Sequence, residues 1–195
     1  MSSNRPKIGV LALQGDVPEH LAALEEAGAS AVRVKTREAL DDVDGLVIPG
    51  GESTTVGMLL ERFELMEPLR RRIAEGMPVF GTCTGLILLA KEIEGSDQPR
   101  IGAMDVAVRR NAYGRQIDSF ETELEAPVLG EAPLPAIFIR APQVTRVEPG
   151  VEVLAENETG PVLIRQGPLL GAAFHPELTP DRRVHELFVE MSRKE

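Results

Sequence analysis

The sequence is poor in cysteine, aromatic residues and cationic charge, and each shortage excludes a class of protein. Its single cysteine, Cys83, excludes an intramolecular disulfide framework and a multi-cysteine zinc site. With no tryptophan and one tyrosine, few rings are present to stack on bases or sugars. The formal net charge of −10 disfavours nucleic acid and anionic membranes as partners, because both bind cationic surfaces.

The chain also lacks a long apolar run. No segment approaches the roughly 18 apolar residues of a membrane span, and the run at residues 8–13 is too short for a signal-peptide core. A chain of 195 residues with 43% hydrophobic and 27% charged residues has the composition of a soluble globular protein. We therefore expect one domain, residues 1–195, in the cytoplasm, with neither nucleic acid nor membrane as a partner.

The first half of the sequence alternates β-branched runs with amphipathic stretches. The runs predict strands at residues 7–13, 31–35, 45–48 and 78–80. The amphipathic stretches predict helices at residues 16–28, 54–62, 67–75 and 86–92. We expect Asp16 to cap the first helix, with Glu19 at the capping-box spacing. Strands separated by helices predict an α/β fold with an open, mainly parallel sheet and helices on both faces.

The second half of the sequence has a different rhythm. Short strands are expected at residues 103–108, 119–124, 136–139, 151–155, 162–166 and 169–174. Glycine, proline and asparagine turns separate these strands, which predicts an antiparallel extension or extra strands on the same sheet. A final helix is expected near residues 182–192.

The motif Gly81-Thr82-Cys83-Thr84-Gly85 lies between a predicted strand and a predicted helix. Flanking glycines allow a tight turn, which is typical of a nucleophile elbow. The N-terminus of the following helix favours the thiolate, and the backbone N–H of Thr84 would point at an oxyanion. The alternative is a buried structural cysteine beside helix-packing glycines, and the pentapeptide alone leaves both possibilities open.

His175-Pro176-Glu177 follows the last predicted strand directly. The spacing of two residues places both side chains on one side of an extended backbone, which the proline supports. A carboxylate beside a histidine can orient the ring and stabilise the imidazolium formed during catalysis. Together with a cysteine elbow in a parallel sheet, this motif favours a catalytic interpretation over a simple turn.

The other two histidines, His20 and His185, lie in predicted helices among charged residues. We therefore expect both to be solvated surface residues. A metal site built from three scattered histidines has no supporting spacing.

Residues 49–55, Pro-Gly-Gly-Glu-Ser-Thr-Thr, follow another predicted strand. Paired glycines before a helix can present backbone N–H groups to an anion. A phosphate loop is one interpretation, although the Lys-Ser/Thr ending of a Walker sequence is missing. Alternatively, Gly51 donates a second N–H to an oxyanion, or the segment is a plain turn.

Taken together, these motifs resemble those of the class I, triad-type glutamine amidotransferases, and specifically of the glutaminase subunits of pyridoxal 5′-phosphate synthase. The resemblance runs nearly end to end, from residues 8–15 to residues 187–191. Its more specific motifs are residues 49–55, residues 81–85, Arg110-Asn111 with Tyr-Gly-Arg-Gln at 113–116, Phe-Ile-Arg-Ala-Pro at 138–142, and Phe-His-Pro-Glu-Leu-Thr at 174–179.

This resemblance implies a flavodoxin-like fold and hydrolysis of L-glutamine through a cysteinyl thioester, with neither a cofactor nor a metal. It implies that Cys83 is the nucleophile, His175 the acid and base, and Glu177 the residue that orients His175. The implied oxyanion donors are the N–H groups of Gly51 and Thr84. The implied glutamine-binding residues are Gly51, Glu52, Ser53, Arg110, Ile139 and Arg140.

The resemblance further implies a partner, the synthase subunit that receives the ammonia. Gln14-Gly15 should lie on the same rim of the sheet and is a plausible contact for it. Thr84 departs from the family pattern, where alanine is expected most often. Two other functions stay open: a glutaminase subunit of another complex, such as that of histidine biosynthesis, and a non-catalytic regulatory module of the same fold.

Overall fold

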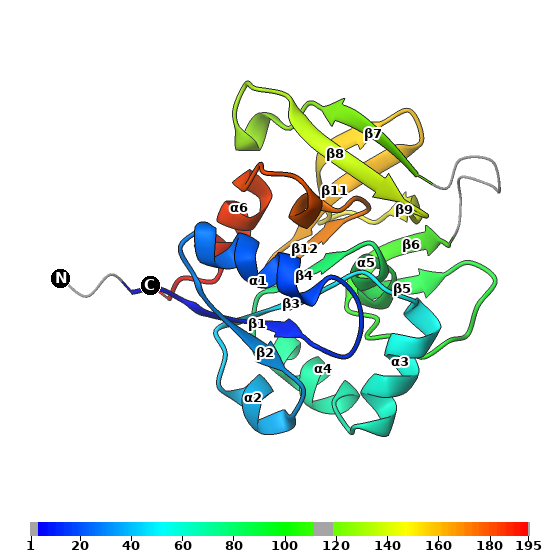
Figure 1. The fold of residues 1–195 in the computed structure, drawn as a ribbon. Helices are drawn as coiled ribbons and strands as arrows, with labels where there is room; N and C mark the ends of the chain where they lie inside the picture. The colour runs from blue at the N-terminus through cyan, green and yellow to red at the C-terminus, as the bar shows by residue number, and fades with distance from the viewer. Residues whose placement is uncertain (1–3, 111–118, 195) are drawn as a thin grey trace.

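A seven-stranded sheet forms the centre of the molecule (Figure 1). The computed structural model describes residues 4–110 and 119–194. The strand order is β10-β11-β12-β4-β3-β1-β2. The parallel strands are β1 (Lys7–Leu11), β2 (Ser30–Val34), β3 (Gly45–Ile48), β4 (Val79–Thr82) and β12 (Leu169–Ala172). Two antiparallel strands, β10 (Glu152–Asn157) and β11 (Gly160–Gln166), extend one edge.

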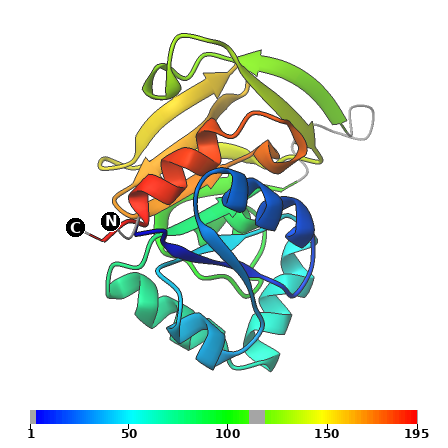
Figure 2. The same cartoon turned by 60° about the vertical axis from the view of Figure 1, so that its left-hand side comes forward.

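Helices cover both faces of this sheet, as the sequence predicts (Figures 1 and 2). On one face, α1 (Val17–Glu26) contacts α6 (Arg183–Met191). On the other, α3 (Ser53–Arg62) contacts α4 (Met66–Ala74) and α5 (Thr84–Leu89). A short helix that the sequence analysis missed, α2 (Arg37–Asp41), contacts α4. None of the described helices is long and apolar enough to cross a membrane.

The strands of the second half are divided among three sheets. Besides β10 and β11 on the main sheet, there is a three-stranded sheet of β5 (Ala90–Ile93), β6 (Met104–Arg109) and β9 (Gln143–Val147). A hairpin of β7 (Ser119–Leu124) and β8 (Leu134–Ile139) forms the third sheet. Two 3₁₀ turns, η1 (Pro127–Leu129) and η2 (Pro176–Leu178), complete the described elements. The predicted antiparallel extension is therefore present, but only part of it joins the main sheet.

The predicted helix at residues 86–92 is wrong in its second half. The helix ends at Leu89, and Ala90 is extended and pairs with Met104 of β6. Between two buried ends, Ala90 and Ile93, the strand exposes Lys91 and Glu92. This short pattern also fits an amphipathic helix, so only the pairing with β6 decides between the two.

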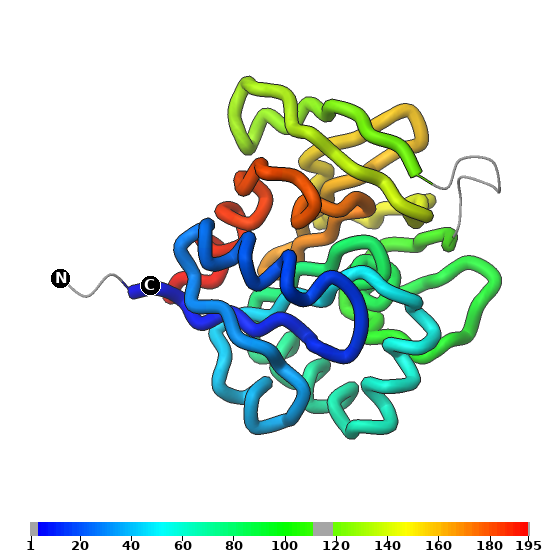
Figure 3. Tube along the Cα trace, in the orientation of Figure 1, coloured from blue at the N-terminus to red at the C-terminus, as the bar shows by residue number. Residues whose placement is uncertain are grey.

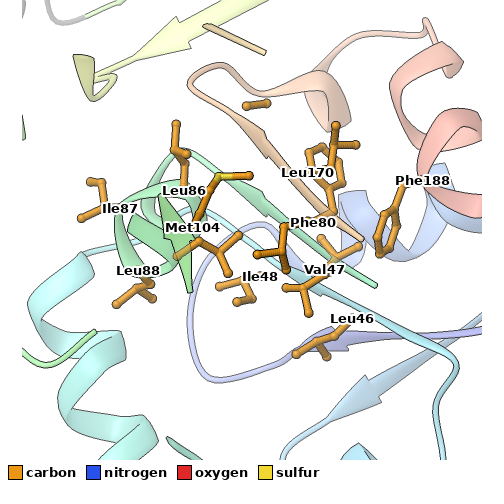
Figure 4. Close-up of a cluster of buried hydrophobic side chains, with 14 of the residues drawn as sticks. Leu46, Val47, Ile48, Phe80, Leu86, Ile87, Leu88, Met104, Leu170 and Phe188 are labelled. Carbon is orange, nitrogen blue, oxygen red and sulfur yellow. The ribbon is translucent and has the colours of Figure 1, made fainter. Parts of the chain in front are cut away.

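The core lies on both faces of the central strands. All four residues of β3 and of β4 are buried, because helices cover a parallel sheet on both sides. Figure 4 shows Leu46, Val47 and Ile48 of β3 beside Phe80 of β4 and Leu170 of β12. Burial of one such side chain contributes roughly 1.5–3 kcal/mol to folding, so these strands form a rigid support.

The carboxyl ends of four adjacent parallel strands, β12, β4, β3 and β1, meet at one edge of the sheet. The segments that follow them contain His175, Cys83, Gly50-Gly51 and Gln14-Gly15 in that order. Figure 3 traces these connections along the chain. Ligands of open α/β sheets bind outside the carboxyl ends of the strands, so this edge is the place for a site.

Candidate active site

Cys83 stands on a strained turn between β4 and α5, as the elbow motif predicts. Its φ of 52° and ψ of −104° are rare for an L residue. The glycines on either side have a steric reason. A Cβ at Gly81 would lie 2.4 Å from the backbone of Gly85, and one at Gly85 would lie 2.1 Å from the carbonyl oxygen of Ile48. The turn therefore requires glycine at both positions.

His175 and Glu177 form the second part of the site. Nδ1 of His175 lies 2.6 Å from Oε1 of Glu177, and both side chains are buried. The backbone N–H of His175 donates to the carbonyl of Ile137, which ties the residue to β8. The predicted extended backbone is wrong, because Pro176 begins the 3₁₀ turn η2. That turn curls Glu177 back towards the His175 ring, so the pair still forms.

The pKa of His175 is the main electrostatic property of the site. Burial opposes the imidazolium, but hydrogen bonds to Cys83 and Glu177 outweigh it and raise the pKa of His175 to about 10. Burial raises the pKa of the Glu177 carboxyl, and the neighbouring His175 offsets this only in part. Contact with both partners therefore keeps a proton on the imidazole at neutral pH, where it can be given to a leaving group.

The turn after β3 lies against the elbow. Thr84 donates its hydroxyl proton to the carbonyl oxygen of Gly51, with Oγ1 and O 2.5 Å apart. The next backbone N–H, that of Glu52, donates to Oε1 of Gln14 at 2.6 Å. Both ends of the Gly51–Glu52 peptide are therefore held, one by the elbow and one by the loop after β1.

The loop after β1 fits closely against the same turn. A Cβ at Gly15 would lie 1.6 Å from the carbonyl oxygen of Gly50, so only glycine allows this approach. On the other side, a Cβ at Gly50 would lie 2.8 Å from Cε1 of His175. The expectation that Gln14-Gly15 lies on the rim of the site is confirmed.

The predicted glutamine-binding residues lie at the start of α3, at the end of β8 and directly after β6. Glu52 caps α3, and its carboxylate accepts hydrogen bonds from the N–H groups of Thr54 and Thr55 and from the Thr55 hydroxyl. Although burial acts in the opposite direction, these bonds lower the pKa of Glu52. Ile139 is the last residue of β8 and Arg140 follows it, and the Ile139 carbonyl oxygen lies 3.7 Å from Sγ of Cys83. Arg140 is exposed, with a φ of 44°.

Ser53 and Arg110 meet at a residue that the sequence analysis missed. Oε1 of Gln98 accepts hydrogen bonds from Arg110 at 2.6 Å, from Ser53 at 3.3 Å and from Thr54 at 3.4 Å. The Gln98 side chain is only 8% exposed, yet its Nε2 has no hydrogen-bond partner among the described residues. A lone glutamine in a loop gives no sequence signal. The rest of the Arg110 motif, residues 111–116, lies outside the described residues.

The prediction that His20 and His185 are solvated is wrong, because both side chains are 0% exposed. They lie on the inner faces of α1 and α6, where both rings contact the ring of Phe80. Their charged sequence neighbours, such as Glu19 and Glu186, are exposed on the outer faces. Burial of these histidines depends on contact between two helices far apart in the sequence.

Asp16 differs from its predicted role as a helix cap. It makes no side-chain hydrogen bond to the first turn of α1, and its Oδ2 lies 3.5 Å from Nδ1 of His175. Potential metal-ligand atoms of Asp16, His175 and Glu177 lie within 4.8 Å of one another. In this arrangement Nδ1 of His175 already contacts Glu177, so a cation there would compete with the pair described above.

Comparisons with known proteins place this chain among its relatives. Two relatives are named pyridoxal 5′-phosphate synthase subunit PdxT. The one from Frankia casuarinae is 59% identical over 190 residues, which cover 96% of each chain. The one from Carboxydothermus hydrogenoformans is 56% identical over 184 residues, which cover 94% of this chain and 96% of the relative.

Solved structures and a family model extend the comparison. A crystal structure of a glutamine amidotransferase is similar with a TM-score of 0.90 and 49% identity, over 95% of this chain and 98% of that one. PurLQS from Thermotoga maritima, 16% identical, shares the fold with a TM-score of 0.71 over 95% of this chain and 98% of that one. The model of the SNO glutamine amidotransferase family matches residues 10–194. The chain therefore belongs to the SNO glutamine amidotransferase family.

Proposed function

We propose that this chain hydrolyses L-glutamine as the glutaminase subunit of a pyridoxal 5′-phosphate synthase and passes the ammonia to a separate synthase subunit. The observation that carries the proposal is the 2.6 Å contact between His175 and Glu177 beside a cysteine elbow. The relatives at 59% and 56% identity bear the name of that synthase. Such a subunit works in the cytoplasm.

In the proposed reaction, Cys83 supplies the nucleophile. Its thiolate attacks the side-chain amide carbon of glutamine and forms a tetrahedral oxyanion. His175 gives its proton to the amide nitrogen, the carbon–nitrogen bond breaks, and ammonia leaves a glutamyl thioester. Water, deprotonated by His175, then attacks the thioester, and glutamate is released with the thiolate restored. Glu177 orients the ring and stabilises the imidazolium throughout.

The oxyanion is held by backbone N–H groups of Gly51 and Thr84. Preorganised donors of this kind typically contribute about 10²–10³-fold each to turnover. The support for Gly51 is its place on a turn fixed by Thr84 and Gln14. The support for Thr84 is its place at the start of α5, directly after the nucleophile.

Glutamine itself is recognised by Gly51, Glu52, Ser53, Arg110, Ile139 and Arg140. Arg110, which Gln98 and Thr54 hold in place, pairs with the α-carboxylate of the substrate. Glu52 receives the α-ammonium through Oε1, which accepts one hydrogen bond in the cap whereas Oε2 accepts two. Gln98 adds a buried donor, Nε2, to this set.

The synthase subunit docks on the rim formed by Gln14 and Gly15 and activates the glutaminase. Ammonia made before an acceptor is ready would be lost to solvent, so coupling of the two reactions is useful. Gln14 is exposed and contacts the backbone of Glu52, so docking there can reach the Gly51 peptide. The Gly51 N–H belongs to the Gly50–Gly51 peptide, which precedes the tethered one and can rotate because both residues are glycine. The isolated chain is therefore expected to be a poor glutaminase.

The test is glutamate and ammonia release by the purified chain, alone and titrated with the synthase subunit encoded by the same organism. We expect slow release alone and a rise of at least tenfold at saturation. Cys83→Ala should be inactive in both conditions, and Glu177→Gln should lower turnover with little change in KM. Equal turnover with and without a bound partner would contradict the activation, and retained turnover in Cys83→Ala would contradict the triad.

A further inference from the structure

A chain of buried side chains continues from Glu177 into the space between α1 and α6. Nε2 of His20 lies 3.5 Å from Oε2 of Glu177 and 3.1 Å from Oγ1 of Thr82. On its other side, Nδ1 of His20 lies 3.0 Å from Nε2 of His185. The His20, His185 and Glu177 side chains are all fully buried. Polar groups placed so deeply are costly unless each proton has a partner.

The partners of these atoms fix where the protons lie. Nδ1 of His185 is buried without a partner among the described residues, and buried N–H groups without a partner are rare in proteins. His185 therefore carries its proton on Nε2 and donates it to Nδ1 of His20. His20 must then carry its proton on Nε2, facing Oε2 of Glu177 and Oγ1 of Thr82. The reverse arrangement would point a lone pair at a carboxylate.

We propose that His20 is a positioning residue for the glutaminase reaction, whose Nε2–H faces the second carboxylate oxygen of Glu177 while His185 fixes the orientation of the His20 ring. Oε1 of Glu177 faces His175, whereas Oε2 is buried without a hydrogen-bond partner among the described residues and lies 3.5 Å from Nε2 of His20. The carboxylate then has a hydrogen bond to His175 on one side and the His20 ring within 3.5 Å on the other. This inference rests on the proposed role of Glu177, which it extends by one residue behind the triad.

A neutral donor suits this place better than a cation. Burial, together with the neighbouring His185 and His175, lowers the pKa of His20 well below its ordinary value. Burial and the nearby Arg182 lower the pKa of His185 to about 3. Both rings are therefore neutral at physiological pH. A lysine or arginine at this point would pair with Glu177 and remove the negative charge that stabilises the His175 imidazolium, whereas a neutral N–H orients the carboxylate and leaves its charge available.

Other titratable groups also face Glu177. His175 lies on its catalytic side, and Asp16, from the loop before α1, makes a hydrogen bond that raises the pKa of Glu177. Cys83 contacts His175 from the start of α5. Because burial and Asp16 both favour the neutral carboxyl, loss of the His20 donor moves Glu177 further towards protonation. A protonated Glu177 no longer supports the imidazolium. As the pH falls, a variant without the His20 donor should therefore lose activity at a higher pH than wild type does.

The first test uses unmodified protein. In the full chain labelled with ¹⁵N-histidine, nitrogen chemical shifts report the protonation of each ring. We expect neutral rings with the proton on Nε2 for both His20 and His185 between pH 6 and 8. A proton on Nδ1 of His20 would overturn the proposal, whatever the fate of any variant.

The second test compares His20→Leu with His20→Gln in the complex with the synthase subunit. Leucine has no donor, whereas glutamine can place an amide N–H near the position of Nε2. We expect His20→Leu to lower kcat by about 10–100-fold, the range for a lost hydrogen bond to a charged group, with KM within twofold. The acid limb of its pH profile should rise by about one unit. His20→Gln should restore most of kcat and most of the wild-type position of the acid limb.

Phe188→Leu serves as the matched control, because this buried α6 residue packs on Phe80 but lies outside the hydrogen-bonded chain. It should lower the melting temperature and leave the pH profile unchanged. The pH dependence of Cys83 alkylation by iodoacetamide gives a readout that needs no partner, and it should shift only in His20→Leu. An unchanged profile in folded His20→Leu, while wild type is active and Glu177→Gln is impaired, would overturn the inference and leave the proposed function intact.

Discussion

Cys83 combines a reactive atom with a backbone conformation that favours glycine. Its φ of 52° and ψ of −104° lie in a sparsely populated region, which costs about 1–3 kcal/mol for an L residue. Cys83→Ala keeps this strain and removes only the sulfur, whereas Cys83→Gly removes both. We expect both variants to be inactive and Cys83→Gly to be about 1 kcal/mol more stable than Cys83→Ala in urea unfolding. If Cys83→Ala loses several kcal/mol while turnover persists, Cys83 is a structural residue.

Thr84 is the residue where this sequence departs from the expected pattern, and its hydroxyl has a partner. Without the bond to the Gly51 carbonyl, that peptide loses one of its two tethers. We expect Thr84→Val to lower glutamine turnover by about 2–10-fold, the range for a neutral hydrogen bond. Thr84→Ser, which keeps the hydroxyl, should retain the wild-type rate. Equal rates in the two variants would show that the hydroxyl does not affect turnover through its bond to Gly51.

Sequence reasoning finds positions that neighbouring residues in the chain mark, and the structure brings Cys83, His175 and Glu177 together. Cys83 lies between glycines that the turn requires, and His175 and Glu177 are two positions apart. Neighbouring residues in the sequence give no such signal for His20 and Gln98. The burial of His20 depends on α6, and the role of Gln98 depends on Arg110 and Ser53 folding against it. Long-range packing, which single-sequence patterns do not encode, decides these two.

At the scale of elements, steric contact decides which residue can occupy the end of β4, more than intrinsic backbone propensity does. A Cβ at Gly81 would meet the Gly85 backbone, which has no room to move, whereas one at Gly28 would meet no atom within 4 Å. Gly28 has the positive φ of a helix C-terminus, so backbone propensity alone would make it the less replaceable of the two glycines.

The comparison of these two glycines gives a prediction about stability. Gly28→Ala should cost about 1 kcal/mol for its backbone conformation, and Gly81→Ala about 3 kcal/mol for overpacking. Chemical denaturation of both variants measures the difference. If Gly28→Ala lost as much free energy of unfolding as Gly81→Ala, or more, the elbow would be able to relax around an added methyl group.

The order of elements in the first half follows from the sequence because each strand and helix there is marked by its own periodicity. The prediction for the α5–β5 junction is wrong for a physical reason. The residues from Ala90 to Ile93 fit the pattern of a helix or of a strand, and only pairing with β6 selects the strand. β9 was missed for a similar reason. Its polar pattern, Gln-Val-Thr-Arg-Val, is that of a strand only once β6 lies beside it.

For the whole molecule, the buried histidines make stability depend on pH from both sides of neutrality. His185 has a folded-state pKa of about 3, below its ordinary value of 6.5. Its contribution is therefore complete above pH 6.5 and is lost as pH falls towards 3, at up to about 1.4 kcal/mol per unit. We expect His185→Phe to flatten this acid slope between pH 6.5 and 5 in urea titrations. An unchanged slope would contradict the burial of a neutral ring.

The contribution of His175 to stability depends on pH in the opposite direction. Its folded-state pKa of about 10 lies above the ordinary 6.5, so its stabilisation is complete below pH 6.5 and is lost as pH rises towards 10. We expect the free energy of unfolding to fall over this range in wild type and to fall less in His175→Asn. Parallel curves for the two proteins would mean that the imidazolium is not stabilised by its neighbours.

The contact between Gly15 and the carbonyl of Gly50 has a consequence for protein engineering. Two loops that begin on different strands behave here as one block, because neither can gain a side chain at the contact unless the other moves. Grafting the turn after β3 alone onto another parallel sheet would leave its Gly50 carbonyl without this contact. A successful transplant has to carry the loop after β1 together with the loop after β3, at the spacing that adjacent parallel strands impose.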